Sequence, residues 1–258
     1  MNLLQNFSWT LSDVWVMTQR NLLRYLRVPQ LLVFSTIQPV MFVLLFTYVF
    51  GGAIQTPGFD YVDFLIPGIL VQTVIFGSAQ TGVGLADDIS KGMIDRFRSL
   101  PMARAAVLAG RTLADTFRNT FVVLLITGVG YLIGFRFHQG LPKAVLAMAL
   151  AVLFGLAFSW ISATIGMLVK DTETAQVAGF IWIFPLVFAS SIFVPIQTMP
   201  AALKAFAEIN PITKTVNSVR ALSLGGEFID PLLGSLIWIA EILVVFVPLS
   251  VEIYRRRT

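Results

Sequence analysis

The sequence predicts an all-α integral membrane protein with six transmembrane helices. The 258-residue chain is 57% hydrophobic and only 12% charged, with a mean hydropathy of +0.82, whereas soluble domains carry about 25% charged residues. Its apolar runs are nearly continuous over about 20 residues, the length of a helix that crosses the hydrocarbon core. They do not alternate between polar and apolar residues as barrel strands do, so we expect helical spans.

Residues 1–28 predict an amphipathic helix that lies in the membrane interface. On a helical projection, one face carries Arg20, Arg24 and Arg27, and the opposite face carries Leu11, Trp15 and Leu22. We expect the arginines at the lipid headgroups and Trp9 and Trp15 as anchors. A buried core helix is the alternative, although the chain offers little soluble mass to cover it. A secretory signal is not expected, because a basic first region is missing.

Six apolar runs follow this helix. The expected spans are residues 31–50, 64–85, 107–135, 144–169, 175–194 and 232–254. The second span contains glycines that permit close approach of neighbouring helices, namely Gly68, Gly77, Gly82 and Gly84. The third span begins with Arg111, Asp115 and Arg118 at a spacing of i, i+4 and i+7, so Asp115 can pair with both arginines.

The polar segment 87–104 between the second and third spans is expected to be a short amphipathic helix. Its apolar side would carry Ile89, Met93, Phe97 and Leu100, and its charged side Lys91, Asp95 and Arg98. We expect Asp87, Asp88 and Ser90 to cap its start and Pro101 to end it. Such a helix would lie at the membrane surface with its charged side available to something outside the membrane. A basic loop that only fixes the topology is the alternative reading.

Residues 195–231 are too polar for a span and too apolar for a plain loop. Two short amphipathic pieces are separated at Asn210-Pro211, since the residue before a proline is disfavoured in the α region. We interpret them as external half-helices that dip into the membrane from the outer side. Simple surface helices are equally compatible with the pattern.

Basic residues orient the chain. With the N-terminus inside, the inner segments hold 12 basic residues and the outer segments hold 5, with Arg118 not assigned. Lysine and arginine concentrate on the cytoplasmic side of membrane proteins, so both termini and segment 87–104 are expected in the cytoplasm. The chain is expected to be a single transmembrane domain in the cell (inner or plasma) membrane. Its basic clusters suit anionic lipids rather than nucleic acid.

Motifs for chemistry are missing from the sequence. The chain has no cysteine and a single histidine, His138, and no metal site is expected. It lacks a G-x-x-x-x-G-K-[ST] phosphate loop, an H-E-x-x-H motif and a G-x-S-x-G elbow. We therefore expect that the chain is not an enzyme on its own and binds no cofactor.

Glu241 is the one acidic residue deep inside a predicted span. A carboxylate in hydrocarbon is costly, so it should face protein, water or a cation. It either lines a transport path that favours cationic substrates or makes a structural hydrogen bond as a protonated acid. Trp160 and Trp182 are further candidates for a substrate path and, with Phe180, could stack on a flat ligand, although aromatic residues in spans more often pack or lie at the interface.

Two stretches carry a resemblance to a known family. The run from Gly92 to Arg104, followed by Gly110-Arg111, resembles the cytoplasmic signature of ABC-2 type export permeases, and in particular of the daunorubicin-resistance-type drug exporters. Asn210-Pro211-Ile212-Thr213, with Val216 and Arg220, resembles the external stretch of that family before its last span. The similarity extends over essentially the whole chain.

The resemblance implies the membrane-spanning subunit of an ATP-driven exporter for a hydrophobic or amphipathic small molecule such as a drug, an antibiotic or a lipid. Two separate ATP-binding subunits would supply ATP and Mg and dock from the cytoplasm. A second permease subunit would complete the transporter, with a homodimer as the expectation.

The resemblance also assigns roles to residues. The cytoplasmic segment becomes a coupling helix, Lys91 to Leu100, and the N-terminal interface helix spans about Trp9 to Arg27. The residues expected to couple to the ATPase are Lys91, Asp95, Arg96, Phe97, Arg98, Leu100, Arg104 and Glu173. Phe97 and Leu100 would fill a pocket on the motor, while Arg96 and Arg98 would fix the register by charge.

Three rival functions stay open at this point. A permease for a polysaccharide or a lipid-linked glycan would share the same motifs. An ion-driven secondary transporter would normally place several ionisable groups at mid-depth, where only Glu241 is found. A lipid-modifying membrane enzyme would need a nucleophile or metal cluster at the membrane edge.

Overall fold

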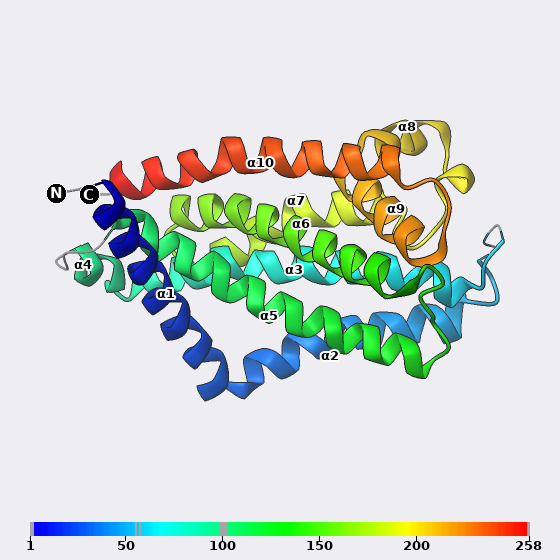
Figure 1. Ribbon diagram of the computed structural model, residues 1–258, viewed down its shortest axis with the longest axis horizontal. Helices are drawn as coiled ribbons and strands as arrows, with labels where there is room; N and C mark the ends of the chain where they lie inside the picture. Colours follow the sequence, from blue (N-terminus) through cyan, green and yellow to red (C-terminus); the bar gives the residue numbers. More distant parts are fainter. Residues whose placement is uncertain (1–2, 55, 57, 99–102, 257–258) are drawn as a thin grey trace.

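The computed structural model describes residues 3–54, 56, 58–98 and 103–256, and within those residues it is helical with no strand (Figure 1). The first half contains α1 (Leu3–Arg27), α2 (Pro29–Leu45), a π-helical turn η1 (Phe46–Phe50), α3 (Tyr61–Ser90), α4 (Met93–Arg98) and α5 (Arg104–Leu132). The second half contains α6 (Gly140–Leu168), α7 (Thr172–Phe188), a 3-10 turn η2 (Ile196–Thr198), α8 (Ala201–Ile209), α9 (Pro211–Leu224) and α10 (Ile229–Arg256).

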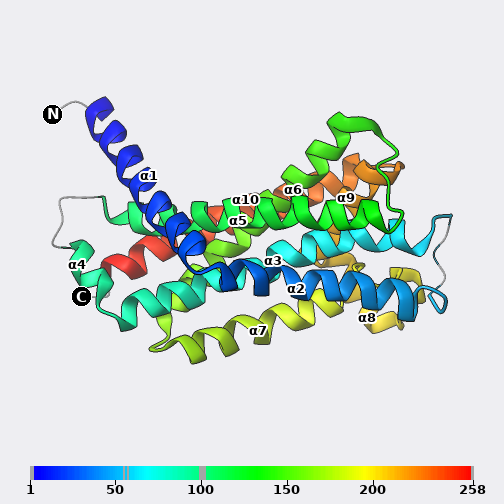
Figure 2. The ribbon, with the colours of Figure 1, turned by 90° about the horizontal axis from the view of Figure 1, so that it is seen from below.

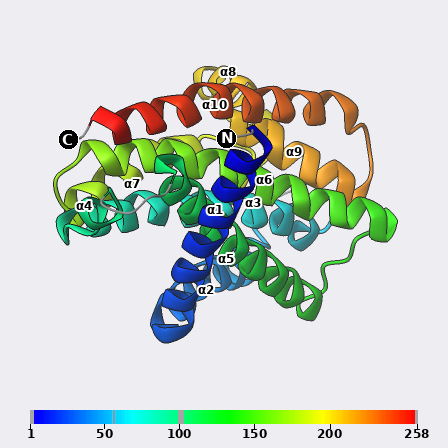
Figure 3. The same cartoon turned by 60° about the vertical axis from the view of Figure 1, so that its left-hand side comes forward.

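Helix α3 forms the centre of the bundle. Most of its residues are buried, and α5, α6, α7 and α9 all pack against it, as Figure 3 shows for the long helices around it. At the crossing of α3 and α6 two glycines face each other. A Cβ added at Gly166 would lie 2.2 Å from the carbonyl oxygen of Gly82, and one added at Gly82 would lie 2.4 Å from that of Ser162. The two backbones therefore touch, as small residues permit in membrane helices.

Among the described residues, three helices are both long enough and apolar enough to cross a membrane, namely α3, α6 and α10. Ser35–Phe50 and Thr172–Phe188 are shorter apolar helices. Helix α5 has 29 residues but carries Arg111, Asp115 and Arg118 in its first half. The chain is thus a helical membrane protein whose outer helices present apolar side chains, for example Val244 on α10, 73% exposed, and Ile181 on α7, 72% exposed.

The two ends of the bundle differ in content. Both termini of the chain, α4 and the turn between α6 and α7 lie at one end (Figures 1 and 2). The opposite end holds the loop after η1, the α5–α6 connection, α8 and one end of α9 (Figure 1). The grouping matches the division into inner and outer segments that the basic residues predict.

The expected single helix over 87–104 is wrong. Helix α3 continues to Ser90, and the break falls at Lys91 and Gly92, where Gly92 has a φ of +64°. Glycine after a helix end adopts this left-handed conformation without a Cβ penalty, so a new helix, α4, starts at Met93. Asp87, Asp88 and Ser90 accordingly belong to the last turns of α3 and cap no helix start, while the expected end at Pro101 lies outside the described residues.

The fifth apolar run also ends earlier than expected. Helix α7 stops at Phe188 rather than Val194. The side-chain amide of Asn210 donates hydrogen bonds to the carbonyl oxygens of Leu186 and Ala189, at 2.8 and 2.9 Å. These bonds satisfy carbonyls that a helix end leaves without partners, and the chain then turns into the segment that precedes η2.

The expected break at Asn210-Pro211 is confirmed. Helix α8 ends at Ile209 and α9 begins at Pro211, where the missing N–H of proline is harmless in the first turn. The Asn210 side chain also accepts a hydrogen bond from the backbone N–H of Ile212 at 2.9 Å. One asparagine therefore caps the start of α9 and the end of α7.

Candidate functional site

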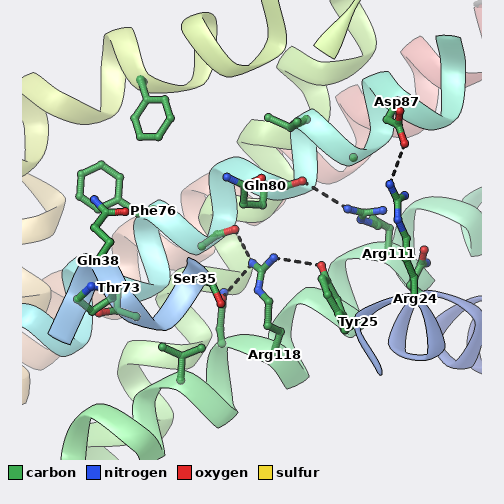
Figure 4. A pocket seen from close by; sticks show the side chains of 18 of the residues that line it. Arg24, Tyr25, Ser35, Gln38, Thr73, Phe76, Gln80, Asp87, Arg111 and Arg118 are labelled. Atoms are coloured by element: carbon green, nitrogen blue, oxygen red, sulfur yellow. Dashed lines mark hydrogen bonds and ion pairs between the residues drawn. The ribbon is translucent and has the colours of Figure 1, made fainter. Parts of the chain in front are cut away.

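A cavity of about 400 Å³ lies between α1, α2, α3, α5 and α7. Figure 4 shows its two contrasting ends: arginines and a tyrosine gather at one, and aromatic and amide side chains at the other. The charged end is lined by Arg24, Tyr25, Asp87, Lys91, Arg111 and Arg118. The other end is lined by Ser35, Gln38, Phe42, Gln72, Thr73, Phe76 and Phe180. The cavity is therefore amphipathic along its length.

The predicted ion pairs on α5 are confirmed and form one wall of this cavity. Asp115, fully buried, lies 3.4 Å from Arg111 Nε and 3.4 Å from Arg118 Nη1. Two further donors come from other helices, because Thr81 Oγ1 donates to Asp115 Oδ2 at 2.6 Å and the Tyr25 hydroxyl donates to Oδ1. The cluster joins α1, α3 and α5 around a single carboxylate.

Sequence reasoning found the α5 triad but not Tyr25 or Thr81. Tyr25 lies 90 residues from Asp115 along the chain, and no periodicity relates the two. The glycines of α3 carried a usable signal. A Cβ at Gly84 would lie 1.8 Å from Arg111 Nη2, and one at Gly77 would lie 2.3 Å from the side-chain oxygen of Asn119. Gly77 and Gly84, seven residues apart on α3, therefore leave room for Asn119 and Arg111, which are eight residues apart on α5.

Several buried polar atoms of the cavity wall have no hydrogen-bond partner in the described part of the chain. They are the Nε of Arg118, the Nδ2 of Asn119 and the Oε1 of Gln72. The three residues are 5%, 2% and 3% exposed. Buried polar groups are nearly always paired, so these atoms mark a place where a further group belongs.

The arginine face of α1 contacts protein rather than headgroups alone. Arg24 pairs with Asp87 at 2.8 Å and with Asp88 at 3.7 Å, and Arg20 pairs with Asp88 at 3.5 Å. The opposite face stays open, with Trp15 51% exposed, as expected for an interface helix. The third arginine, Arg27, is also exposed.

The structure describes some of the residues expected to couple to a motor, among them Lys91, Arg96 and Phe97. Lys91 pairs with Asp87 at 2.8 Å, and Arg96 is exposed on α4. Phe97 is half-buried in the chain itself, and the guanidinium of Arg20 lies 4.7 Å from its ring centre. Leu100, and the side chains of Asp95, Arg98 and Arg104, lie outside the described part of the structure.

Glu173 is exposed in the first turn of α7, in the turn that lies at the same end as α4 (Figure 2). Asp171 caps this helix, accepting hydrogen bonds from the backbone N–H and the hydroxyl of Thr174 at 2.7 and 2.9 Å. These bonds favour the ionised form and hold the pKa of Asp171 below its usual range.

A chain of phenylalanine rings runs from the cavity toward the end that holds α8. Phe76 contacts Phe180 and Phe184, with ring centres 5.8 and 5.5 Å apart. The series continues through Phe184–Phe188, Phe188–Phe193, Phe193–Phe46 and Phe46–Phe50, at 5.6, 5.4, 4.4 and 5.1 Å. The rings form one continuous aromatic surface contributed by α3, α7 and η1 together with the segment after α7, and we call it the phenylalanine track.

Trp160, Trp182 and Glu241, which were predicted for a substrate path, do not line the cavity, whereas Phe180 does. Trp160 is buried in a cluster with Met17 and Leu85, and Trp182 stacks on Phe158 at 5.4 Å between ring centres. Glu241 is exposed on α10. Of the aromatic residues that sequence reasoning named, Phe180 lines the cavity, where it contacts Phe76.

The second stretch of the resemblance is explained by packing. Arg220 donates to the carbonyl oxygens of Phe64 and Ser191, at 3.0 and 2.9 Å, and its guanidinium lies 3.7 Å from the Phe64 ring centre. Asn210 and Pro211 set the junction of α8, α9 and α7 described above. These residues hold α9 against α3 and the end of α7.

The helices enclose an amphipathic cavity with an aromatic track beside it, an arrangement that transport proteins share with other membrane proteins. The family model of the ABC-2 type transporter matches residues 12–224. The chain belongs to this family of ABC transporter permeases.

Curated relatives agree over nearly the whole length. The chain is 37% identical to the daunorubicin resistance ABC transporter permease protein DrrB1 of Streptomyces coeruleorubidus, over 97% of this chain and 87% of the relative. It is 27% identical to the probable doxorubicin resistance ABC transporter permease protein DrrC of Mycobacterium tuberculosis, over 93% and 87%. The inner membrane transport permease YadH of Escherichia coli is 22% identical, over 83% of each chain.

Proposed function

We propose that this chain is the membrane-spanning subunit of an ATP-driven exporter for a hydrophobic or amphipathic small molecule. The observation that carries the proposal is the family match over residues 12–224, together with relatives that are named for resistance to daunorubicin and doxorubicin. The amphipathic cavity and the phenylalanine track support it. They offer a polar end and a run of aromatic faces on which a flat compound stacks.

The proposed topology has six spans in the cell membrane with both termini in the cytoplasm. The spans are α2 with η1, α3, α5, α6, α7 and α10, and α1 lies in the inner interface. The grouping of both termini with α4 at one end of the bundle supports this arrangement (Figure 1), as does the excess of basic residues at that end. Helices α8 and α9 then lie at the outer side, whether or not they enter the membrane.

Energy comes from a separate chain in this proposal. Two ATP-binding subunits carry ATP and Mg, and this chain pairs with a second permease subunit, most simply its own copy. Binding of ATP would draw the two α4 segments together and rotate the attached spans as rigid bodies, which gives alternating access. Two ion pairs connect the residues just before α4 with the cavity. Lys91 pairs with Asp87, and Asp87 pairs with Arg24 of α1.

Charge reversal in α4 tests the coupling. Arg98→Glu is expected to leave the permease in the membrane at normal abundance but to separate ATP hydrolysis from export, because it inverts the charge offered to the motor. The measurement is export and ATP turnover by vesicles that contain both subunits. Lys204→Glu, a matched reversal on the exposed side of α8 at the other end, serves as the control. Normal export by Arg98→Glu would refute the coupling role.

Glu241 remains a candidate for substrate selection. Its place on the exposed side of α10 fits a contact with a second permease subunit or with lipid. Glu241→Gln with unchanged export of both cationic and neutral compounds would remove the residue from the path.

A further inference from the structure

The charged end of the cavity carries more positive than negative side chains. The cations that line it are Arg24, Lys91, Arg111 and Arg118, and the acids that they contact are Asp87, Asp88 and Asp115. Four lining cations therefore contact three carboxylates among the described residues, and the two buried ones, Arg111 and Arg118, share Asp115. An uncompensated positive charge next to hydrocarbon is costly, so the arrangement calls for an anion.

Unpartnered donors point in the same direction. Two buried N–H groups of the wall, Arg118 Nε and Asn119 Nδ2, have no acceptor in the described part of the chain. Asn119 presents its amide nitrogen because its oxygen already accepts from Arg118 Nη2 at 3.2 Å. An acceptor from outside the chain would satisfy these donors, and oxyanions supply several acceptor oxygens at once.

The cavity also has a direction relative to the membrane. Its cationic end lies beside the last turns of α3 and the end of α1, next to Asp87 and Arg24. Its aromatic end, with Phe76 and Phe180, lies toward the middle of α3 and α7 (Figure 4). Under the proposed topology, charge is at the inner surface and the apolar lining is deeper, which is the orientation of a lipid of the inner leaflet.

We propose that this cavity binds an anionic phospholipid of the inner leaflet, with the phosphate at Arg111, Arg118 and Asn119 and the acyl chains along Phe76 and Phe180. Basic pockets between transmembrane helices on the cytoplasmic side recognise such headgroups. The inference rests on the proposed topology for its leaflet, but not on any cargo or on ATP.

Competitive lipid retention tests the proposal. The full chain is reconstituted in nanodiscs of equal phosphatidylglycerol and phosphatidylcholine, and native mass spectrometry reads the lipid that stays bound. One phosphatidylglycerol per chain is expected, preferred over phosphatidylcholine by about tenfold. Equal retention of the two lipids would overturn the assignment, because the zwitterionic headgroup carries no net negative charge.

Isosteric charge variants locate the site. Asn119→Asp keeps the acceptor for Arg118 while adding a negative charge, and it is expected to lower the preference by about tenfold. Gln72→Glu places a charge on the facing wall and gives a second reading if the first variant unfolds, as thermal unfolding would reveal. Gln176→Glu, on the exposed side of α7, is the matched control and is expected to retain the preference. An unchanged preference in both cavity variants would refute the site.

Inorganic phosphate separates a lipid from a free anion. Millimolar phosphate is expected to leave phosphatidylglycerol bound, since phosphate lacks the apolar body that the phenylalanines hold. Displacement by phosphate alone would show a simple anion site and overturn the lipid assignment. Because every arm reads binding and not transport, an absence of ATP-driven export would contradict the proposed function without affecting this result.

Discussion

The carboxylate of Asp115 is the most densely bonded acidic group in the described part of the chain. It accepts hydrogen bonds from Thr81 and Tyr25 and pairs with Arg111 and Arg118. Through these contacts a single residue of α5 holds α1 and α3 in place. The energetic consequence is asymmetric, since a buried ion pair adds little net stability but its disruption leaves unpaired charges in the interior.

Removal of the Asp115 carboxylate tests this at the residue scale. Asp115→Ala leaves two buried guanidinium groups without their acid and is expected to lower the free energy of unfolding by about 3–5 kcal/mol. The purified variant in detergent is compared with the parent by thermal and chaotrope unfolding. Glu252→Ala, which breaks the exposed pair with Arg256, is expected to cost under about 1 kcal/mol. Similar losses in both variants would contradict a structural role for the cluster.

Asn210 makes a second residue-scale prediction. Asn210→Asp keeps the oxygen that caps α9 but loses the N–H groups that bond the carbonyls of Leu186 and Ala189. The expected loss of stability is about 1–3 kcal/mol, because two buried carbonyl oxygens then face a carboxylate. Amide hydrogen exchange should rise at the end of α7 while the start of α9 stays protected. An equal rise of amide exchange at the end of α7 and at the start of α9 would indicate that the cap on α9, and not the bonds from Asn210 to Leu186 and Ala189, carries the stability.

At the scale of elements, the crossing of α3 and α6 depends on the absence of side chains. The backbones of Gly82 and Gly166 approach so closely that any Cβ must displace backbone atoms of the other helix. Moving backbone atoms costs more free energy than moving the tip of a flexible side chain, so we expect α3 and α6 to keep this spacing at the crossing. Helices α5, α7 and α9 are arranged around the same α3.

A methyl group at that crossing is expected to be poorly tolerated. Gly166→Ala should cost about 1–3 kcal/mol, the usual range for overpacking of a close-packed interior, and should lower the yield of folded protein. Gly128→Ala in α5, where a Cβ would meet nothing within 4 Å, is the matched control. It should be neutral or slightly stabilising, because alanine favours helix more than glycine does. A neutral Gly166→Ala variant would show that α3 and α6 can separate without loss.

Much of the element order could be predicted from the sequence, because long apolar runs have few other solutions in a membrane protein. The α5 ion pairs also followed from spacing alone. The break at Gly92 was missed because helical periodicity continues across it, although glycine after a polar turn is itself a stop signal. The early end of α7 depends on Asn210, which comes 22 residues later, and local patterns do not encode such a contact.

The candidate site was harder to predict than the fold. Its walls come from five helices, and Tyr25 and Gln72 can be recognised as lining residues only when the packing of those helices is known. Of the three aromatic residues named for stacking, Trp160 and Trp182 pack against other helices, and Phe180 lines the cavity. The signal that could have helped was the pair Gly77 and Gly84, which predicts bulky neighbours on one face of α3.

At the scale of the whole molecule, the bundle has a charged end that is joined to α4 and an apolar outer surface. Exposed apolar side chains cover α2, α7 and α10, for example Met41, Ile181 and Val244. Lipid and a second permease subunit both suit such a surface. The sequence contains no phosphate loop for ATP, and in the proposed function movement enters the permease through this charged end.

Reconstituted transport measures this central claim most directly. Vesicles are prepared with the permease alone, with its candidate ATP-binding subunit alone and with both, and the accumulation of a fluorescent anthracycline is followed after addition of MgATP. We predict accumulation only when both subunits are present, and its loss when ATP is replaced by a non-hydrolysable analogue. Accumulation driven by the permease alone, with no nucleotide-hydrolysing subunit in the vesicle, would contradict the account.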